Sequence, residues 1–251
     1  MQHPDDLRRA ALARSPGAPW VTWYRVAPAG TEVAAVVARV ELSNATLANW
    51  VAKTAGYLSE EFDIGAGSVV GLRLPLHWQL HVWAYGAWAL GAAVACIGAA
   101  DDVARVPAPL LAVGTDPMGL PLGSATPEGA LDALADVRGY PDFFDCPPVA
   151  PDAAVIALGG RRLDANQAAA LLPSGDVGTD GATSVITDAP DGPRALLAAT
   201  VAAPARGQPT VLVDVSPASA RHPEACASTL ARIGQQEGLT GTGELGTPRP
   251  D

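Results

Sequence analysis

Two arginines that directly follow a pair of glycines form the strongest candidate for an anion-binding site in this sequence. Gly159 and Gly160 follow the apolar run AAVIAL, and Arg161 and Arg162 come directly after them. The run has the composition of a buried strand, and ligands of α/β proteins bind beyond the carboxyl ends of such strands. Guanidinium groups placed there could pair with a phosphate. The alternative interpretation is two surface arginines in an exposed loop.

The segment HWQLH has the histidine spacing of a helical zinc site. His77 and His81 stand four residues apart, but Trp78 occupies the place that a metalloprotease gives to its general-base glutamate. Zinc needs three or four ligands, and no third ligand is evident near this pair. We therefore expect no metal, and we interpret His77 as a residue at the start of a helix.

Three further motifs match binding or catalytic patterns only in part. The glycine string GAGSVVG precedes an expected strand, and its third glycine comes one residue late for a dinucleotide fingerprint. PSGDVGTDG offers Asp176 and Asp180 but lacks the later bidentate acid of a calcium loop. Ser184, Ser216 and Cys226 have no recognisable histidine partner. These patterns predict a turn, a solvated loop and no catalytic nucleophile.

The composition indicates a globular protein and excludes several partners. The chain has 251 residues, of which 49% are apolar and 17% charged. Its formal net charge of −10 disfavours nucleic acid and anionic membranes. Three cysteines without CxxC spacing indicate neither a disulfide framework nor a zinc site, and the first residues lack the pattern of a signal peptide. A cytoplasmic location is expected.

An uncharged run from residue 82 to residue 100 is about as long as a membrane-spanning helix. We interpret it instead as the end of a helix that begins near His77, followed by a short buried strand, AAVACIG. Gly91 can end such a helix as its C′ residue, and no Lys or Arg cluster flanks the run. A membrane span is the alternative.

Strands and helices are expected to alternate through the first part of the chain. A leading helix and connector occupy residues 1–19, and strands follow at WVTWYRV and at residues 32–40. An amphipathic helix is predicted over SNATLANWVAKTAGYLSEEF, with Ser43 or Asn44 as its N-cap, and a buried strand over SVVGLRLP. This order predicts an α/β fold with mainly parallel sheets covered by helices.

The rest of the chain is expected to form a second lobe. GALDALADV is predicted to be a short helix and YPDFFDCPPVAP a connector, with a boundary near residues 147–152. Beyond it, strands AAVIAL, ATSVITD and PTVLVDV alternate with helices DANQAAALL, PRALLAATVAAPA and HPEACASTLARIGQQ. The predicted units are residues 20–146, residues 147–240 and a disordered tail at 241–251. Core packing is expected for Trp50, Trp78, Trp83 and Trp88.

Several phrases occur in the order and spacing of a known enzyme superfamily. LSNATL, GAGSVVGLRLPLH and WALGAAV resemble the opening of an adenylate-forming domain, as found in acyl-CoA synthetases, luciferases and nonribosomal peptide adenylation domains. The series from AAVIALGG through PTVLVDV to LARIGQQEGLT is similar to that superfamily's phosphate-loop region and the segment after it. The resemblance covers about residues 20–240 and only the first half of the large domain. It is closest to short actinobacterial proteins that look like truncated, degenerate members.

The resemblance implies a phosphate loop of the form T-S-G-[ST]-T-G-x-P-K-G, whose hydroxyls and lysine hold ATP. This chain has GGRRLDANQ there, so Gly159 and Gly160 keep the flexibility while the hydroxyls and the lysine are absent. The superfamily's Y-G-x-T-E segment and carboxy-terminal catalytic lysine also find no match. Transfer chemistry at phosphate depends on such positioned charge. No catalytic residue is therefore predicted.

The resulting prediction is a non-catalytic protein that binds or scaffolds a nucleotide, an acyl group or a partner protein. The candidate ligand residues are Gly159, Gly160, Arg161 and Arg162, and the resemblance implies ATP or AMP as the nucleotide. The alternative is an AMP-forming acid ligase component whose missing half comes from a partner chain.

Overall fold

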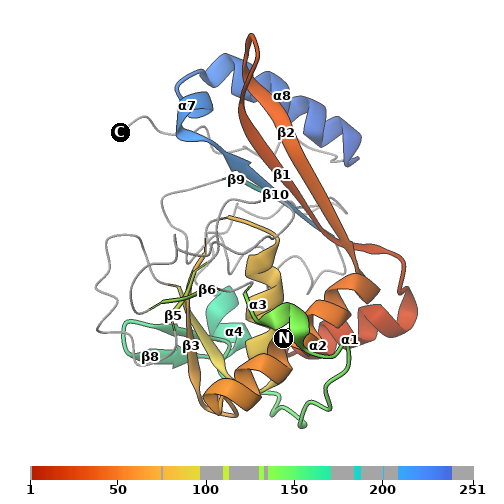
Figure 1. Cartoon of the computed structure of the whole chain (residues 1–251), viewed down its shortest axis with the longest axis vertical. Coiled ribbons are helices and arrows are strands. Elements are labelled where there is room, and N and C mark those ends of the chain that lie inside the picture. Colours follow the sequence, from red (N-terminus) through yellow and green to blue (C-terminus); the bar gives the residue numbers. More distant parts are fainter. Residues whose placement is uncertain are drawn as a thin grey trace.

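The computed structural model describes residues 2–74, 76–96, 110–112, 130–132, 135–170, 184–187, 200 and 209–238. These parts form a mixed α/β protein with two sheets and covering helices, which confirms the predicted fold class (Figure 1). The calcium-like stretch at 173–181, the helix PRALLAATVAAPA apart from Thr200, and the tail at 241–251 lie outside the described residues.

The larger sheet has six strands among the described residues, in the order β6-β5-β3-β4-β7-β8. Neighbouring strands run parallel except β7 and β8, which form an antiparallel pair. The strands are β3 (Val69–Arg73), β4 (Ala93–Cys96), β5 (Leu110–Ala112), β6 (Ala130–Asp132), β7 (Ile156–Leu158) and β8 (Arg161–Leu163). The helices near it are α2 (Asn44–Phe62), α3 (Gln79–Ala89) and the short α4 (Ala165–Ala169).

The helix predicted for GALDALADV is wrong. Residues 130–132 form strand β6, and Val137–Gly139 form a single 3-10 turn. Strand β6 pairs in parallel with β5, with Leu110 opposite Ala130 and Ala112 opposite Asp132. Pairing with the edge of the sheet, which is a tertiary interaction, has overridden the local helical pattern.

The second sheet has the order β2-β1-β10-β9 in the described part of the chain. Its strands are β1 (Pro19–Ala29), β2 (Glu32–Ser43), β9 (Ser184–Thr187) and β10 (Thr210–Val215), with β1 and β10 parallel. Helices α7 (Pro217–Ala220) and α8 (Pro223–Gln236) lie beside this sheet at the upper end of the molecule (Figure 1). The predicted strands and the final helix of this region are confirmed.

Both sheets take strands from either side of the expected boundary near residues 147–152. Strand β7 joins the larger sheet beside β4, where Val94 is opposite Ile156. Strand β1 joins the second sheet beside β10, where Val21 is opposite Thr210. Long-range strand pairing therefore crosses the predicted boundary, and the division into two lobes stays a prediction.

Helix α2 begins where the sequence predicts. Ser43 is its N-cap, and the Ser43 hydroxyl accepts a hydrogen bond from the backbone N–H of Thr46 at 3.2 Å. The apolar positions of the predicted stripe are buried, among them Leu47, Val51 and Leu58. This face packs on α3 and on the sheet, as an amphipathic helix must.

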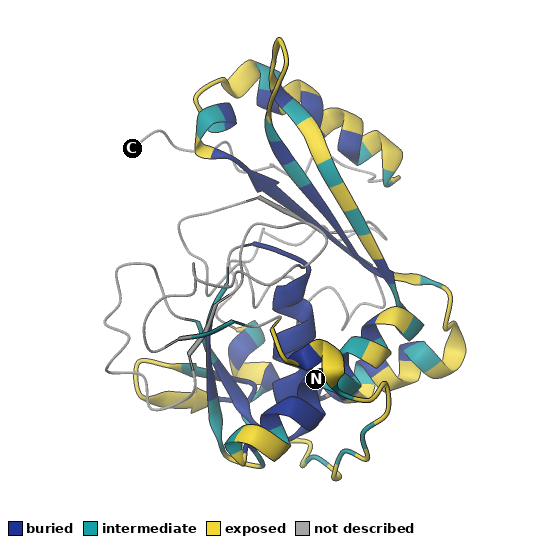
Figure 2. Cartoon of the chain, in the orientation of Figure 1, coloured by how far each residue is buried: buried dark blue, intermediate teal, exposed yellow. Residues whose placement is uncertain are grey.

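Helix α3 is buried along its whole length (Figure 2). Trp78, Trp83 and Trp88 are buried in the larger core, and Trp50 of α2 lies half-buried with its ring 5.6 Å from that of Trp78. The leading helix α1 (Pro4–Arg14) packs on α2 and α3. The predicted core role of the tryptophans is thus confirmed.

The end of α3 has the hydrogen bonds of a Schellman motif. Gly91 has a φ of 73°, its N–H donates to Trp88 O at 3.0 Å, and the N–H of Ala92 donates to Ala87 O at 3.0 Å. Strand β4 follows at Ala93, so the uncharged run divides at Gly91 as predicted. Within the described residues, no helix has the length and apolar character to cross a membrane.

Gly91→Val is expected to lower the free energy of unfolding by about 1–3 kcal/mol. A β-branched residue is strained at this φ, and a Cβ would lie 3.3 Å from the Cα of Ala66. The measurement is urea unfolding beside Gly17→Val, because Gly17 is exposed with nothing within 4 Å of a Cβ. Equal unfolding midpoints for the two variants would show that Gly91 is not a required cap.

Candidate functional site

The four predicted ligand residues lie together in a tight hairpin. Strand β7 ends at Leu158 and β8 begins at Arg161, so the connection holds only Gly159 and Gly160. The glycines have φ values of 56° and 77°, the left-handed conformation of a two-residue hairpin turn. The two arginines therefore belong to an edge strand, not to the loop that the sequence suggested.

Register within the hairpin separates the arginine side chains. Leu158 is opposite Arg161, and Ala157 is opposite Arg162. Consecutive residues of a strand point to opposite faces, so the two guanidinium groups do not converge on one point. Arg161 is exposed, while Nη1 of Arg162 donates a hydrogen bond to the carbonyl oxygen of Gly67.

This contact ties the hairpin to the turn that joins α2 to β3. Gly67 has a φ of 81°, and its N–H donates to Gly91 O at 3.1 Å. Both arginines are exposed, and the guanidinium of Arg162 has a structural partner in Gly67. A ligand-binding role for these residues stays a prediction.

The polar residues after the hairpin start a helix. Oδ1 of Asp164 accepts from the N–H of Gln167 at 2.9 Å, and Oε1 of Gln167 accepts from the N–H of Asp164 at 3.1 Å. This reciprocal capping box satisfies two backbone donors at the start of α4. Asp164 and Gln167 of the segment GGRRLDANQ therefore cap the N-terminus of α4.

Lys53 is the chain's single lysine, and it lies far from the β7–β8 hairpin in the sequence. It donates to Tyr140 O at 2.5 Å and to Arg138 O at 3.4 Å, and it pairs with the carboxylate of Asp142 at 2.9 Å. These contacts hold the segment around Tyr140 against α2. They make Lys53 a structural residue.

Solved structures of adenylate-forming enzymes share this architecture. An acyl-CoA synthetase of Brucella canis aligns with a TM-score of 0.62 and 16% identity, over 96% of this chain and 46% of that one. NpsA of Klebsiella oxytoca, in complex with 3-hydroxyanthranilyl-AMSN, aligns with a TM-score of 0.59 and 13% identity, over 89% of this chain and 46% of NpsA. The nonribosomal peptide synthetase FmoA3 aligns with a TM-score of 0.58 and 18% identity, over 84% of this chain and 24% of FmoA3. The chain therefore shares the fold of the matching part of these enzymes.

The likeness extends over only part of each compared protein. A Mycobacterium tuberculosis protein, whose name gives a family designation and no activity, is 32% identical over 148 residues, or 52% of this chain. That match covers 57% of the mycobacterial protein, and this chain spans less than half of the enzymes above. No protein family model matches the chain.

The β7–β8 turn belongs to GGRRLDANQ, the segment that the sequence resemblance compares with a phosphate loop. The turn contains two glycines and offers neither a hydroxyl nor an ammonium group. A two-residue turn is also too short to wrap a triphosphate, because each residue spans at most about 3.5 Å.

The histidine pair shows no metal-binding arrangement. Nδ1 of His77 accepts from the N–H of Gln79 at 3.3 Å, which supports its interpretation as a helix-start residue. His77 and His81 are both buried, and the ring of His77 lies 4.5 Å from that of Trp23. Among the described residues, no group of three His, Cys, Asp or Glu side chains could hold a metal ion.

The candidate nucleophiles with described side chains also have local partners. Ser216 is the N-cap of α7, where its hydroxyl accepts from the N–H of Ser219 at 3.2 Å. The Cys226 thiol donates to Ser219 O at 3.0 Å, and burial raises its pKa. A thiol held as the neutral form is a poor nucleophile.

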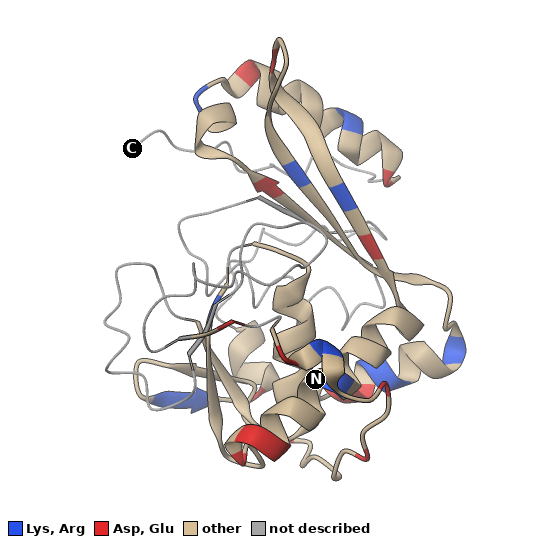
Figure 3. Ribbon diagram, viewed as in Figure 1, with Lys and Arg blue, Asp and Glu red and all other residues tan. Residues whose placement is uncertain are grey.

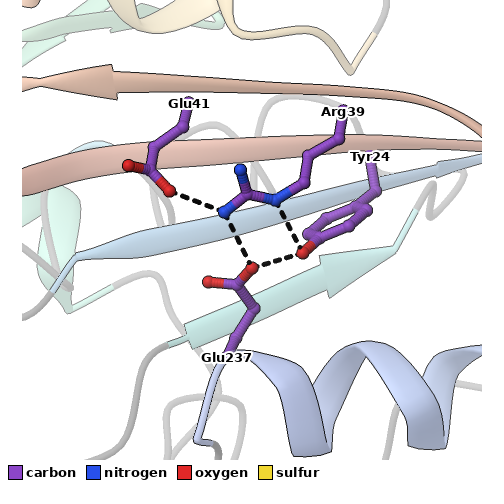
Figure 4. A network of polar contacts seen from close by, with 4 residues as sticks. All are labelled: Tyr24, Arg39, Glu41 and Glu237. Carbon is purple, nitrogen blue, oxygen red and sulfur yellow. Dashed lines mark hydrogen bonds and ion pairs between the residues drawn. The ribbon is translucent and has the colours of Figure 1, made fainter.

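A polar network that the sequence analysis missed joins the second sheet to the end of α8 (Figure 4). Arg39 donates to Tyr24 Oη at 3.0 Å, to Glu41 at 2.6 Å and to Glu237 at 3.2 Å. The Tyr24 hydroxyl donates to Glu237, and burial together with this bond raises the Tyr24 pKa to about 12. Arg39 and Glu41 lie two apart on one face of β2, but nothing in the sequence pointed to Glu237.

Proposed function

We propose that this chain is a non-catalytic protein of the adenylate-forming fold, with a binding or scaffolding role. The observation that carries the proposal is the two-glycine turn between β7 and β8. Catalysis of adenylate formation relies on donors and cations that hold the phosphates while charge develops. The turn provides no such side chain, and the single lysine is bound to Asp142 and the Tyr140 carbonyl.

The proposed ligand site comprises Gly159, Gly160, Arg161 and Arg162, and it would bind ATP or AMP through a phosphate. Support comes from the exposed Arg161 and from glycines that permit close approach of the backbone. An acyl group or a partner protein is the other ligand considered. The free cysteines Cys96, Cys146 and Cys226 fit the reducing cytoplasm.

Thermal shift with ATP, AMP, CoA and acyl-CoA esters tests this site. A ligand at a hundred times its Kd stabilises the folded state by about 2.7 kcal/mol, so a rise in Tm is expected with the nucleotides. Arg161→Gln should remove most of that rise. Arg221→Gln, at an exposed arginine that ends α7, should leave it unchanged. A shift that survives Arg161→Gln would place the nucleotide elsewhere.

No carboxylate-dependent release of pyrophosphate is expected from ATP and Mg²⁺. The reason is the missing hydroxyl and ammonium groups at the β7–β8 turn. A pyrophosphate assay with fatty, aryl and amino acids measures this, beside an active acyl-CoA synthetase as the positive control. Turnover that Arg161→Gln or Arg162→Gln abolishes would overturn the non-catalytic assignment.

The second candidate is a ligase component completed by a partner chain. It is favoured by one observation, that the chain spans 46% of the Brucella canis acyl-CoA synthetase. Pyrophosphate release that appears only when a second polypeptide is added would support it.

A further inference from the structure

His81 is a titratable side chain sealed inside the molecule. It lies on α3 with no exposed surface, and neither ring nitrogen has a hydrogen-bond partner within the described part of the chain. Its ring stacks on that of Tyr85 at 6.1 Å. Trp20 of β1 packs edge-on against the same tyrosine at 5.5 Å, and the Tyr85 hydroxyl donates to Thr200 O at 2.7 Å.

The charged groups that act on Tyr85 come from α1. Asp5 and Arg8 are both buried and lie close enough to act electrostatically on Tyr85. Asp5 is already engaged, because it pairs with Arg8 and with Arg9 at 2.6 Å each. His3, also buried, sits at the start of the same helix, where Nδ1 accepts from the N–H of Asp5.

Helix α3 itself offers no compensating charge. It contains no Asp, Glu, Lys or Arg, and it stands out as an uncharged ribbon in Figure 3. The titratable groups beside it are His77, one turn earlier, which is likewise buried and packs on Trp23, and Tyr57 of α2, whose ring lies 6.0 Å from that of Trp83. A proton on His81 would therefore create a buried cation, and no carboxylate of the described residues accepts a hydrogen bond from it, which is strongly unfavourable.

We propose that the seam formed by the first turns of α1, the helix α3 and Trp20 of β1 is an acid-operated joint, which opens when His81 takes up a proton. The seam consists of His3, Asp5, Arg8, Trp20, His81 and Tyr85. Opening hydrates the His81 ring and releases the contacts of Tyr85 with Trp20 and Thr200.

The direction of the pH effect follows from linkage. Burial lowers the pKa of His81 from 6.5 to about 3 in the folded state, so below pH 6.5 the unfolded or opened state binds the proton more tightly. The contribution of neutral His81 is complete above pH 6.5 and is lost as the pH falls toward 3. Burial also lowers the pKa of His3, against the opposing charges of Asp5 and Asp6, and so acts in the same direction.

The size of the effect is roughly tenfold in the folding equilibrium constant for each pH unit between about 6 and 4. From pH 7.0 to pH 4.5, His81 should lower that constant roughly a hundredfold. The effect should also be local at first. The seam belongs to the larger core, whereas α8 packs in a separate cluster with Tyr24, Val26 and Val213.

Urea unfolding of the full chain at pH 7.0 and pH 4.5 tests the joint. His81→Phe keeps the aromatic volume and removes the ionisable group. On acidification, the folding equilibrium constant of this variant should therefore fall by a factor roughly a hundredfold smaller than that of the original protein. His222→Phe makes the same change at an exposed histidine and should match the original protein. Equal losses for the original protein and His81→Phe would overturn the proposal.

Two measurements on the unmodified protein keep the proposal testable if His81→Phe does not fold. In an NMR titration of the histidine rings, His81 should remain neutral in the folded protein down to about pH 4, whereas titration near 6.5 would overturn the proposal. In hydrogen exchange corrected for the intrinsic pH effect, α1 and α3 should lose protection at a higher pH than α8. Simultaneous loss in all three helices would also count against a local joint.

Discussion

Gly86→Ala should destabilise the protein strongly, although alanine is the better helix former. A Cβ at Gly86 would lie 2.6 Å from Cγ2 and 2.8 Å from Cβ of Thr54, far inside van der Waals contact. Thr54 is fully buried on α2, so neither side chain can turn away into solvent. Overpacking of this kind costs about 1–3 kcal/mol or more, which exceeds the gain of about 1 kcal/mol in helix propensity. Chemical denaturation measures the difference.

A reciprocal exchange provides the control for this prediction. Thr54→Gly removes both clashing atoms, so Gly86→Ala combined with Thr54→Gly should recover much of the stability that Gly86→Ala alone has lost. Gly17→Ala, at an exposed site without neighbours, should change little. If Gly86→Ala proves as stable as the original protein, α2 and α3 are not in the close contact described.

Asp5→Ala is expected to cost about 3–5 kcal/mol, the usual range when one partner of a buried ion pair is removed. Oδ1 of Asp5 accepts from Nε of Arg8 at 2.7 Å, and both side chains are almost wholly buried. Without the carboxylate, the Arg8 guanidinium remains in the interior as an uncompensated charge. The change should appear as a large fall in Tm.

Two comparison variants separate the buried charge from the helix itself. Arg9 is the other partner of Asp5, and the Arg9 side chain is 49% exposed. Arg9→Ala should therefore cost less than about 1 kcal/mol. Asp5→Leu together with Arg8→Met replaces the whole pair by apolar groups and should be far more stable than Asp5→Ala. A cost for Asp5→Ala no greater than that of Arg9→Ala would contradict the prediction.

The sequence alone predicted those elements whose formation depends on local physics. The N-cap of α2 at Ser43 and its apolar stripe could be recognised because hydroxyl capping and 3.6-residue periodicity operate within a few turns. Gly91 could be recognised as a helix end because few other residues adopt a left-handed C′ conformation. The phrases LSNATL, GAGSVVGLRLPLH and WALGAAV, in their order and spacing, also resemble the opening of an adenylate-forming domain.

The strand pairing was beyond local reasoning. Residues 130–132 have a helical pattern, yet they form β6 because strand β5 offers hydrogen bonds to its backbone. The expected division near residue 147 does not follow the sheets, because β1 pairs with β10 across almost 200 residues of sequence. Such pairs are decided by which edges meet when the chain collapses, and no short window of sequence contains that information.

The same distinction applies to the candidate site and the acid-operated joint. The order of residues placed Gly159, Gly160, Arg161 and Arg162 together, and the resemblance to adenylate-forming enzymes implied that the hydroxyls and lysine of a phosphate loop are missing. Only the tertiary structure put the arginines on an edge strand, gave Arg162 a partner in Gly67, and buried His81 without a hydrogen-bond partner among the residues it describes. Residue type and spacing determine which chemistry a side chain could perform. Burial and partners from distant segments decide its charge state and its availability, because both depend on the dielectric and hydrogen-bonding surroundings that packing creates.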